Sequence, residues 1–347
     1  MRRFFVSVTA ICLTAGLLAF AWAAQRRGGD DTATPGSTPG STGTVRTDTL
    51  WSMALGVSKA LTVYLPPSYG EDSTRRYPVL YYLHGKGGDE RNWVDVGALH
   101  RTMDALVAAG APEAIIAMPD GDDGWYTTWG ILPDLAACER DTARREPAAT
   151  FCVPWTRYDD YITSDIVGWM DGHYRTQGDR AHRGVAGLSM GGYGAITLAL
   201  AYPQVFSAAA SHSGVLSPRL LPDSVQRARG VRYARDREET ALAARTLWPQ
   251  QWTAFGRDTI AWRARDPRTL AGRLAEQVKA GRAQWPALLI DVGVDDPWYA
   301  QNVDFDASLT RLGVPHEYHE WPGTHNWDYW RTHSRESLRF LLDRVGR

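Results

Sequence analysis

A chain of 347 residues is long enough for one large domain or two small ones. Hydrophobic residues make up 44% of it and charged residues 22%, which is typical of a globular protein. With a formal net charge of −1 and both signs spread along the chain, the sequence carries no signature of a nucleic-acid-binding protein.

The first 24 residues predict a targeting segment. Arg2 and Arg3 form a basic start, and the stretch 4–24 carries no charge. The tripeptide Ala-Trp-Ala at 21–23 offers the small-residue cleavage site of a secretory signal peptide. An uncleaved stretch of about 20 residues would also just span a bilayer, so residues 1–24 are either a signal peptide or a signal anchor. Both alternatives predict that the folded part lies outside the cytoplasm, secreted, periplasmic or in the cell envelope, with membrane attachment only through this segment.

Residues 25–47 are rich in Gly, Pro, Ser and Thr. A segment of this composition cannot bury apolar surface, so it predicts a flexible linker. We therefore expect the folded domain to occupy residues 48–347.

Two cysteines follow the leader, Cys138 and Cys152. An even pair in an oxidising compartment predicts a disulfide, and the alternative is two unpaired buried thiols. A disulfide that closes a loop of about 15 residues would stabilise the fold by roughly 3 kcal/mol in the chain-entropy model.

From residue 48 onward, short apolar runs alternate with helical stretches, which predicts an α/β fold with a mostly parallel central sheet and helices on both faces. Four runs are continuously apolar, as expected of strands covered on both faces. These runs are 79–83, 114–118, 184–188 and 287–292. Helical patterns lie between them, for example at 161–174 and 302–312. The Arg-, Ala- and Glu-rich stretch at about 217–283 is predicted to form a helical insertion above the sheet rather than a separate domain.

The pentapeptide Gly-Leu-Ser-Met-Gly at 187–191 matches the G-x-S-x-G pattern of a nucleophile elbow. Alone the pattern is weak, because it arises by chance in roughly one protein in ten. Here it follows an apolar run and opens the helical stretch 192–200. A strand that turns sharply into a helix holds its serine at the helix N-terminus, where free N–H groups favour a developing oxyanion. Ser189 is the candidate nucleophile, and the alternative is a surface serine in a glycine-rich turn.

A serine hydroxyl needs a base, and the base needs an orienting acid, in the chain order Ser, Asp or Glu, His. Asp295 and Asp296 directly follow the apolar run 287–292. They would therefore lie at the same sheet edge as the nucleophile. Asp296 is the preferred acid and Asp295 the alternative, although Asp-Asp-Pro is also good turn chemistry. Asp291, within the run, is expected to be structural.

His325 is the candidate base. It lies on a loop that contains Gly323, after the strand-like stretch 317–320 and before the final helix. Most histidines have surface or packing roles, and this chain has nine. Of these, His325 has the loop position that the chain order of the triad requires.

The stretch 81–89 is an apolar strand that runs into His-Gly and a glycine-rich turn. Such a loop can present a backbone N–H to an oxyanion, here from Lys86, beside the N–H of Met190. A generic glycine turn is the alternative. Neither the spacing of a phosphate-binding loop nor the H-E-x-x-H pattern occurs, so no cofactor or metal is expected.

Tryptophan is abundant, with 15 residues. Trp125 and Trp129 follow a strand and a Gly/Asp-rich turn, while Trp298, Trp327 and Trp330 flank the candidate acid and base. They predict either an aromatic substrate cleft for acyl or sugar groups or ordinary packing, and the sequence favours neither.

With these pieces in order, the chain resembles the esterase D / antigen 85-like branch of the α/β-hydrolases, the putative esterase family. The matching stretches span nearly all of 50–345. They are VYLPPSY at 63–69, YPVLYYLHG at 77–85, MPDG at 118–121, GLSMGG at 187–192 and PGTHNW at 322–327. The resemblance implies the α/β-hydrolase fold, a triad of Ser189, Asp296 and His325, and an oxyanion hole from the amides of Lys86 and Met190.

Two departures narrow the expected activity. S-formylglutathione hydrolases resemble the chain but carry a cysteine shortly after the oxyanion loop, where 87–91 has none. Antigen 85-like acyltransferases lack the His-Gly pair and use a glutamate as the triad acid. The resemblance thus favours a secreted serine esterase that acts on short-acyl, acetyl or feruloyl esters of small molecules or glycans. The alternatives are an acyltransferase with the same triad and a non-catalytic relative.

Overall fold

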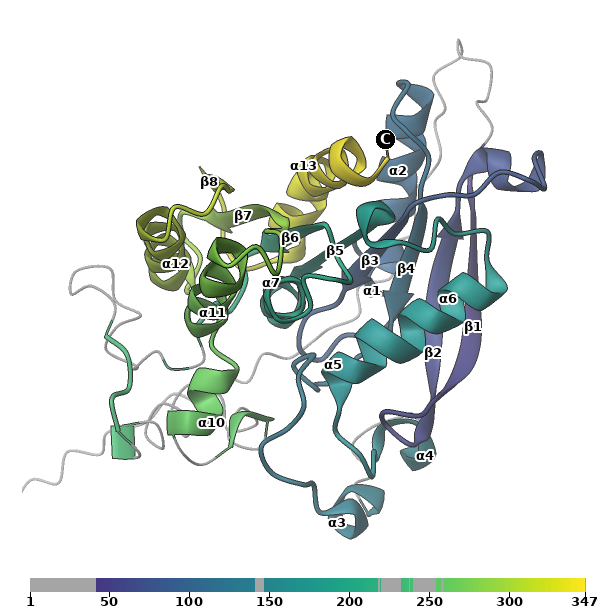
Figure 1. The fold of residues 1–347 in the computed structure, drawn as a ribbon. Helices are drawn as coiled ribbons and strands as arrows, with labels where there is room; N and C mark the ends of the chain where they lie inside the picture. Colours follow the sequence, from purple (N-terminus) through teal and green to yellow (C-terminus); the bar gives the residue numbers. More distant parts are fainter. Residues whose placement is uncertain are drawn as a thin grey trace, which may run out of the picture. The chain divides into compact units, whose positions relative to one another are not determined.

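A mixed, mostly parallel sheet forms the centre of the computed structural model (Figure 1). The structure describes residues 42–140, 147–217, 219, 232–236, 238–239, 254–256 and 259–346. The predicted targeting segment 1–24 and most of the predicted linker lie outside these residues. Among the described residues, no helix combines the length and the apolar character needed to cross a bilayer.

The sheet has eight strands in the order β1-β2-β4-β3-β5-β6-β7-β8 among the described residues. The strands are β1 (Thr44–Ser52), β2 (Val57–Leu65), β3 (Val79–Leu83), β4 (Ile115–Pro119), β5 (Arg183–Leu188), β6 (Ala208–His212), β7 (Ala287–Gly293) and β8 (Glu317–Trp321). β2 pairs antiparallel with both β1 and β4, and all the other neighbours are parallel. The parallel part of the sheet therefore directs the carboxyl ends of six strands, β3 to β8, to one edge.

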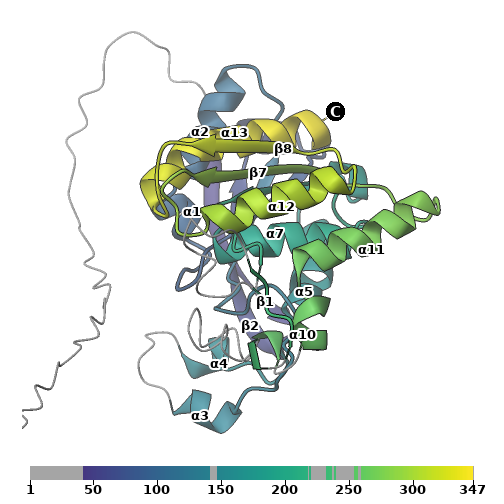
Figure 2. The same cartoon turned by 90° about the vertical axis from the view of Figure 1, so that its left-hand side faces the viewer.

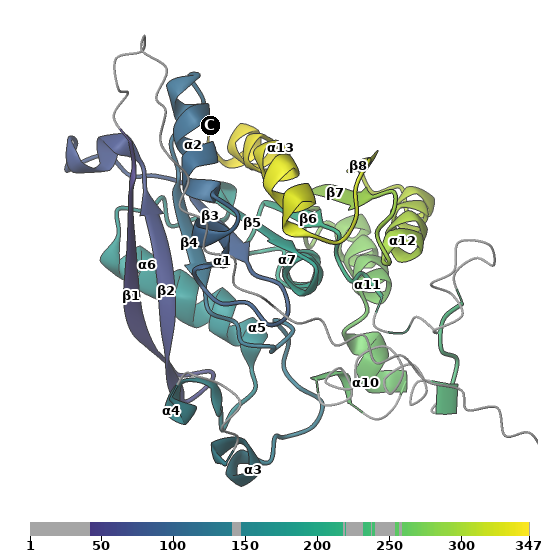
Figure 3. The ribbon, with the colours of Figure 1, turned by 180° about the vertical axis from the view of Figure 1, so that it is seen from behind.

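Helices cover both faces of the sheet (Figures 1 and 3). One face carries α2 (Leu99–Ala108) and α13 (Trp327–Val345). The other carries α6 (Val167–His173), α7 (Met190–Ala201), α11 (Pro267–Lys279) and α12 (Tyr299–Arg311). The remaining short helices are η1 (Pro67–Gly70), α1 (Asn92–Asp95), α3 (Leu135–Glu139), α4 (Ala148–Phe151), α5 (Tyr158–Asp160), the π-helical turn η2 (Tyr161–Ile166), η3 (Arg180–His182) and α10 (Thr259–Ala264).

Two hydrophobic cores lie on the two sides of the sheet. Along β3, Val79 and Tyr81 join the core under α6 and α7, whereas Leu80 and Tyr82 join the core under α2 and α13. This alternation follows from the two-residue period of a strand. Because both faces are buried, β3, β4 and the part of β5 after Arg183 are apolar, which is why their runs are continuous in the sequence.

The α/β prediction is confirmed, and the four predicted strands correspond to β3, β4, β5 and β7 within one residue at each end. The domain boundary needs a correction, because β1 begins at Thr44, inside the linker predicted for 25–47. β1 is an edge strand whose side chains are mostly exposed, so its polar sequence resembles a linker.

Part of the segment 217–283 is not an insertion above the sheet, because it contributes to the helices that cover one face of the sheet. Its described helices are α10 and α11. α11 packs against both α7 and α12 over the sheet (Figure 2). Residues 220–231 and 240–253 of the predicted insertion lie outside the described residues.

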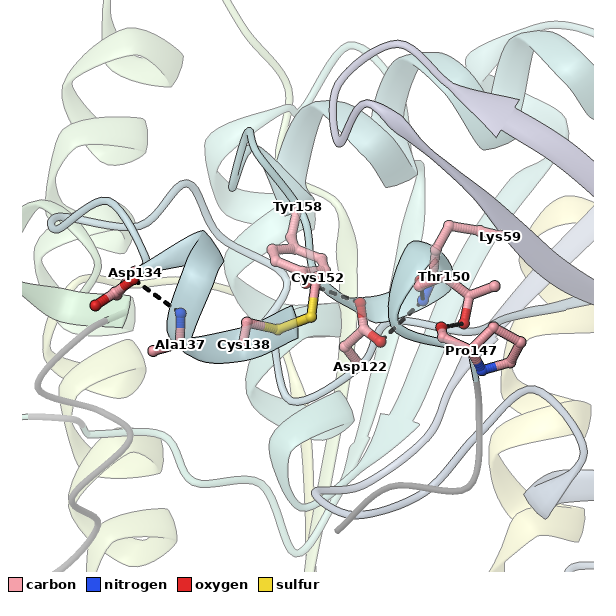
Figure 4. The surroundings of a disulfide bond; sticks show 9 residues. All are labelled: Lys59, Asp122, Asp134, Ala137, Cys138, Pro147, Thr150, Cys152 and Tyr158. Atoms are coloured by element: carbon pink, nitrogen blue, oxygen red, sulfur yellow. Dashed lines mark hydrogen bonds and ion pairs between the residues drawn. A yellow bond between two sulfur atoms is a disulfide. The ribbon is translucent and has the colours of Figure 1, made fainter. Parts of the chain in front are cut away.

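The predicted disulfide is present and joins Cys138 in α3 to Cys152, directly after α4 (Figure 4). It closes a segment that leaves the sheet after β4 and returns before α5.

Candidate active site

The predicted site residues meet at the carboxyl edge of the parallel strands. Ser189 follows β5, Asp296 follows β7 and His325 follows β8, while the loop with Lys86 follows β3. Ligand and catalytic sites of open α/β sheets lie at this edge, because the loops that leave neighbouring strands converge there.

Ser189 occupies a strained turn between β5 and α7. Its backbone has φ 53° and ψ −114°, in a region that residues with a Cβ rarely adopt. The turn is held by a hydrogen bond from Ser189 N–H to the carbonyl of His212 in β6, at 2.9 Å. A Cβ on Gly187 would lie 2.4 Å from the backbone of Gly191, so the pattern G-x-S-x-G reflects a steric requirement.

Three side chains form a hydrogen-bonded row. The Nε2 atom of His325 lies 2.9 Å from Ser189 Oγ, and its Nδ1 atom lies 2.9 Å from Asp296 Oδ2. The other carboxylate oxygen of Asp296 accepts the N–H of Trp298 at 2.8 Å. A carboxylate only accepts hydrogen bonds, so Nδ1 carries the ring proton and Nε2 can accept the serine proton. Asp296 is buried, whereas 22% of the His325 side chain is exposed.

Asp295 takes a different position from Asp296. It is exposed, its N–H donates to the carbonyl of Gly323 at 2.9 Å, and its carbonyl accepts from the hydroxyl of Thr324 at 3.1 Å. Of the two candidate acids, Asp296 therefore contacts His325, and Asp295 joins the acid loop to the base loop. Asp291, expected to be structural, is fully buried and accepts a hydrogen bond from the hydroxyl of Tyr329.

The loop after β3 packs directly against the nucleophile. A Cβ on Gly85 would lie 3.6 Å from the Cβ of Ser189 and 2.5 Å from a methyl of Leu188. His84 Nε2 accepts the N–H of Gly121 at 2.9 Å, so its ring proton is on Nδ1, which donates to the carbonyl of Gly85 at 2.8 Å. The C=O and N–H of a trans peptide point in opposite directions. Holding the Gly85 carbonyl therefore fixes the direction of the Lys86 N–H.

Met190 supplies the second predicted oxyanion donor. It is the first residue of α7, and the N–H of a first helical residue has no partner within its own helix. Its N–H also lies at the positive end of the helix dipole. Lys86 follows β3 and Met190 follows β5, and these two strands are neighbours in the sheet. Both predicted oxyanion donors therefore belong to segments that adjoin Ser189.

The predicted cleft tryptophans fall into two groups. The ring of Trp298 lies 6.5 Å from that of His325, and half-buried Trp327 packs edge-on against Trp330, whose ring lies 4.9 Å from His325. Trp298 and Trp330 thus lie beside His325, and Trp327 lies behind Trp330.

Trp125 and Trp129 make their ring contacts with other aromatic residues. Trp125 is only 1% exposed and packs edge-on against Tyr193 and Phe255, so it offers almost no surface to a substrate. Trp129 is half-buried, stacks on Tyr158 and donates its ring N–H to the carbonyl of Gly124 at 3.0 Å. The expectation that Trp125 lines a cleft therefore does not agree with its burial.

One charged cluster beside the site was not predicted. Lys59 in β2 is buried and forms ion pairs with Asp120 and Asp122, which follow β4. The sequence did hold a signal, because the two-residue period places Lys59 on the same strand face as Val57 and Leu61. A lysine on an apolar face predicts a buried ion pair.

No group of three or more His, Cys, Asp or Glu side chains suited to a metal ion occurs in the described part of the chain.

The chain matches the family model described as putative esterase over residues 52–340. This match covers most of the chain, and the protein therefore belongs to the putative esterase family. It is 31% identical over 285 residues to an esterase of Mycobacterium tuberculosis, an alignment that covers 78% of this chain and 53% of the relative. The chain thus spans about half the length of that relative. An endo-1,4-beta-xylanase/feruloyl esterase of Xylanibacter ruminicola is 27% identical over 197 residues, which cover 55% of this chain and 24% of that protein.

Solved structures agree with this assignment. A ferulic acid esterase superposes with a TM-score of 0.63 at 26% identity, covering 88% of this chain and 99% of that one. An S-formylglutathione hydrolase from Agrobacterium tumefaciens superposes with a TM-score of 0.62 at 19% identity, covering 89% and 98%. The predicted α/β-hydrolase fold is therefore confirmed.

Proposed function

We propose that this protein is a serine carboxylic ester hydrolase that acts outside the cytoplasm through an acyl-enzyme on Ser189. The observation that carries the proposal is the 2.9 Å contact between Ser189 Oγ and the Nε2 atom of an imidazole whose Nδ1 atom is held by buried Asp296. Membership of the putative esterase family independently supports the hydrolysis of carboxylic esters.

In the proposed reaction, His325 Nε2 takes the hydroxyl proton while Ser189 Oγ attacks the ester carbonyl carbon. The carbonyl oxygen becomes an oxyanion, which the N–H groups of Lys86 and Met190 stabilise. The C–O bond to the alcohol then breaks and the leaving alkoxide takes the proton from His325. A water molecule, deprotonated by His325, then attacks the acyl carbon. The bond from this carbon to Ser189 Oγ breaks, the acid leaves, and Oγ takes its proton back from His325. Asp296 keeps the imidazole in the required tautomer throughout.

The proposed substrates are short-acyl, acetyl or feruloyl esters. Two of the similar proteins are named as feruloyl or ferulic acid esterases. The half-buried ring of Trp327, which packs against Trp330 beside the base, suits a flat aromatic acyl group or a sugar face.

Two features support action outside the cytoplasm, with residues 1–24 as the leader and the stretch that follows as a linker. The leader has the composition of a secretory signal. The Cys138–Cys152 disulfide is of the kind that persists in oxidising compartments.

The test is a rate comparison on p-nitrophenyl acetate, longer p-nitrophenyl esters and methyl ferulate. We expect wild-type protein to release the acid and Ser189→Ala to lose at least about a hundredfold in rate. Ser207→Ala is the matched control, because Ser207 directly precedes β6 at the opposite edge of the sheet.

Near-wild-type rates in Ser189→Ala would remove Ser189 from the mechanism. With glycerol added, free acid should remain the main product, whereas a predominance of acylated glycerol would replace the hydrolase proposal by an acyltransferase.

A further inference from the structure

Lys59 is a buried charge that the proposed reaction does not use. Lys59 is only 1% exposed, and its ammonium group has three acceptors, one for each proton. These are Asp120 Oδ2 at 2.5 Å, Asp122 Oδ1 at 2.9 Å and the backbone carbonyl of Thr150 at 2.9 Å. Three well-placed acceptors are what makes a buried ammonium group tolerable.

The cluster is held together electrostatically. Burial by itself would lower the pKa of Lys59, but Asp122 and Asp120 outweigh burial and raise it, so the lysine stays charged. Burial and the neighbouring Asp120 raise the pKa of Asp122 to about 7. Although burial opposes it, the pKa of Asp120 is lowered, because the charge of Lys59 and a hydrogen bond from it favour the ionised form. The hydroxyl of Tyr158 also donates to Asp122, at 2.8 Å.

The two aspartates begin a strained loop, residues 120–126. Asp122, Trp125 and Tyr126 have φ values of 49°, 56° and 48°, all in the left-handed region. Residues with a Cβ hold such conformations only where their surroundings compensate for the strain. The Lys59 ion pairs provide that compensation at the start of the loop.

This strained loop is hydrogen-bonded to the loop that contains Lys86. The N–H of Gly121 donates to His84 Nε2 at 2.9 Å, and the hydroxyl of Tyr126 donates to the His84 carbonyl at 3.1 Å. In the other direction, the N–H of Gly87 donates to Asp123 Oδ1 at 2.6 Å. His84 in turn holds the Gly85 carbonyl, which fixes the direction of the Lys86 N–H.

On its other side, Lys59 holds the segment closed by the disulfide (Figure 4). Thr150 lies in α4, and Cys152 follows it by two residues and joins Cys138 in α3. In Figure 4 Asp122 lies between the Lys59 ammonium and Tyr158, and its carboxylate is bonded to both. Hydrogen bonds and ion pairs thus connect α4, through Lys59 and loop 120–126, to the peptide after His84.

We propose that Lys59 is a positioning residue for the oxyanion loop, and that through the Thr150 carbonyl it ties this loop to the disulfide-closed segment. The kinetic consequence rests on the proposed esterase function. Without the ammonium group the start of loop 120–126 loses its anchor, and the Lys86 N–H is no longer held in the direction that the oxyanion requires. Because an oxyanion forms only in the transition state, the loss falls on kcat and spares KM.

The test compares Lys59→Met with Lys279→Met, which makes the same change at an exposed lysine at the end of α11. We expect Lys59→Met to lower kcat about tenfold, less than removal of a whole oxyanion donor, with little change in KM. We also expect faster amide hydrogen exchange in a peptide covering 84–88, where Gly87 and Gly88 N–H are bonded, and unchanged exchange in β8. Lys279→Met should match wild type in all three measurements.

If Lys59→Met does not fold, the double variant Cys138→Ser/Cys152→Ser tests the proposal in its place. It should shift kcat and the exchange of 84–88 in the same direction, by a smaller factor. The proposal is overturned if the exchange of 84–88 is unchanged in whichever of the two variants folds, or if the kinetic loss appears in KM alone. Hydrogen exchange does not depend on turnover, so a wild-type protein that hydrolyses no ester would refute the esterase function and still leave this positioning role to be decided by exchange.

Discussion

The described part of the molecule contains two arrangements in which a histidine lies between a serine and an aspartate. At the carboxyl edge of the sheet, Ser189 Oγ lies 2.9 Å from Nε2 of His325, whose Nδ1 lies 2.9 Å from Asp296. In the core under α13, Ser337 Oγ lies 2.8 Å from Nε2 of His212, whose Nδ1 lies 2.6 Å from Asp291. The distances are similar, but His212 Nδ1 and Asp291 Oδ2 are not aligned for a hydrogen bond, whereas both His325 contacts are hydrogen bonds.

The two arrangements differ in their exposure to solvent and in the direction of the hydrogen bond between serine and histidine. Ser337, His212 and Asp291 are all 0% exposed, so no substrate reaches them, whereas the His325 side chain is 22% exposed. The single proton of the Ser337 hydroxyl is donated to the carbonyl of Ser334 at 3.0 Å. His212 Nε2 must then donate to Ser337, which is the reverse of what a general base does.

The backbone makes a further difference. Ser189 sits at a strained turn before the first residue of α7, next to helix N–H groups that are not used within the helix. Ser337 lies in the interior of α13, where the helix uses those groups. The comparison indicates that the proposed chemistry depends on a solvent-accessible histidine and on a turn with free N–H groups, and not on the three residue types alone.

The largest expected effect comes from removing the base. His325→Ala should lower kcat on a p-nitrophenyl ester by about 10⁵-fold, as large a loss as removal of the nucleophile, because the two act as one unit. His316→Ala, which directly precedes β8 at the opposite sheet edge, is the control and should keep the wild-type rate. A loss of less than tenfold in His325→Ala would show that another group takes the serine proton.

Asp296→Asn should have the next largest effect. The amide keeps the shape of the side chain but can stabilise the wrong imidazole tautomer, so we expect kcat to fall by about 10⁴-fold. Steady-state kinetics with a soluble ester measure this loss. If Asp295→Asn were the more damaging of the two substitutions, the assignment of the acid would be reversed.

The corresponding change in the buried arrangement should affect stability instead. Asp291→Asn leaves His212 without its carboxylate in the core, and breaking a buried pair of this kind costs about 3 kcal/mol or more. Urea denaturation measures this free energy of unfolding, and kcat per folded molecule should stay near that of wild type. A loss of kcat as severe as that of Asp296→Asn would mean that the buried arrangement takes part in catalysis.

Ser337→Ala should have the smallest effect of the series. It removes the acceptor shared by His212 and the hydroxyl of Tyr82, so the free energy of unfolding should fall by about 2 kcal/mol. The esterase rate should not change, and thermal denaturation together with kinetics on the same sample checks both statements. A rate loss without a stability loss would contradict the comparison.

The sequence predicted that Ser189, Asp296 and His325 lie together at the carboxyl edge of the sheet, because each of them lies in a recognisable local pattern. Ser189 lies in a G-x-S-x-G pattern, and the acid and base follow strand-like runs in turn-forming loops. The buried arrangement has no such signal, because His212 ends a strand of three alanines, a serine and a histidine that does not stand out as apolar. For the same reason β6 was not predicted.

The charged cluster at Lys59 depends on contacts that pattern analysis cannot supply. Lys59 and Asp122 are 63 positions apart, and their meeting requires β2 to pair with β4 across the sheet. The position of Trp125 likewise depends on a left-handed backbone that turns its ring into the core, which sequence spacing does not reveal. Local motifs therefore identified Ser189, Asp296 and His325, while the groups that support them could be identified only in the folded chain.

The central claim is tested most directly by mapping the adduct of a fluorophosphonate probe on the native protein by mass spectrometry. The account predicts one modified serine, Ser189, with Ser337 unmodified and no labelling of Ser189→Ala. Folded wild-type protein that takes no label, or a Ser189→Ala variant that is labelled as fast as wild type, would contradict it.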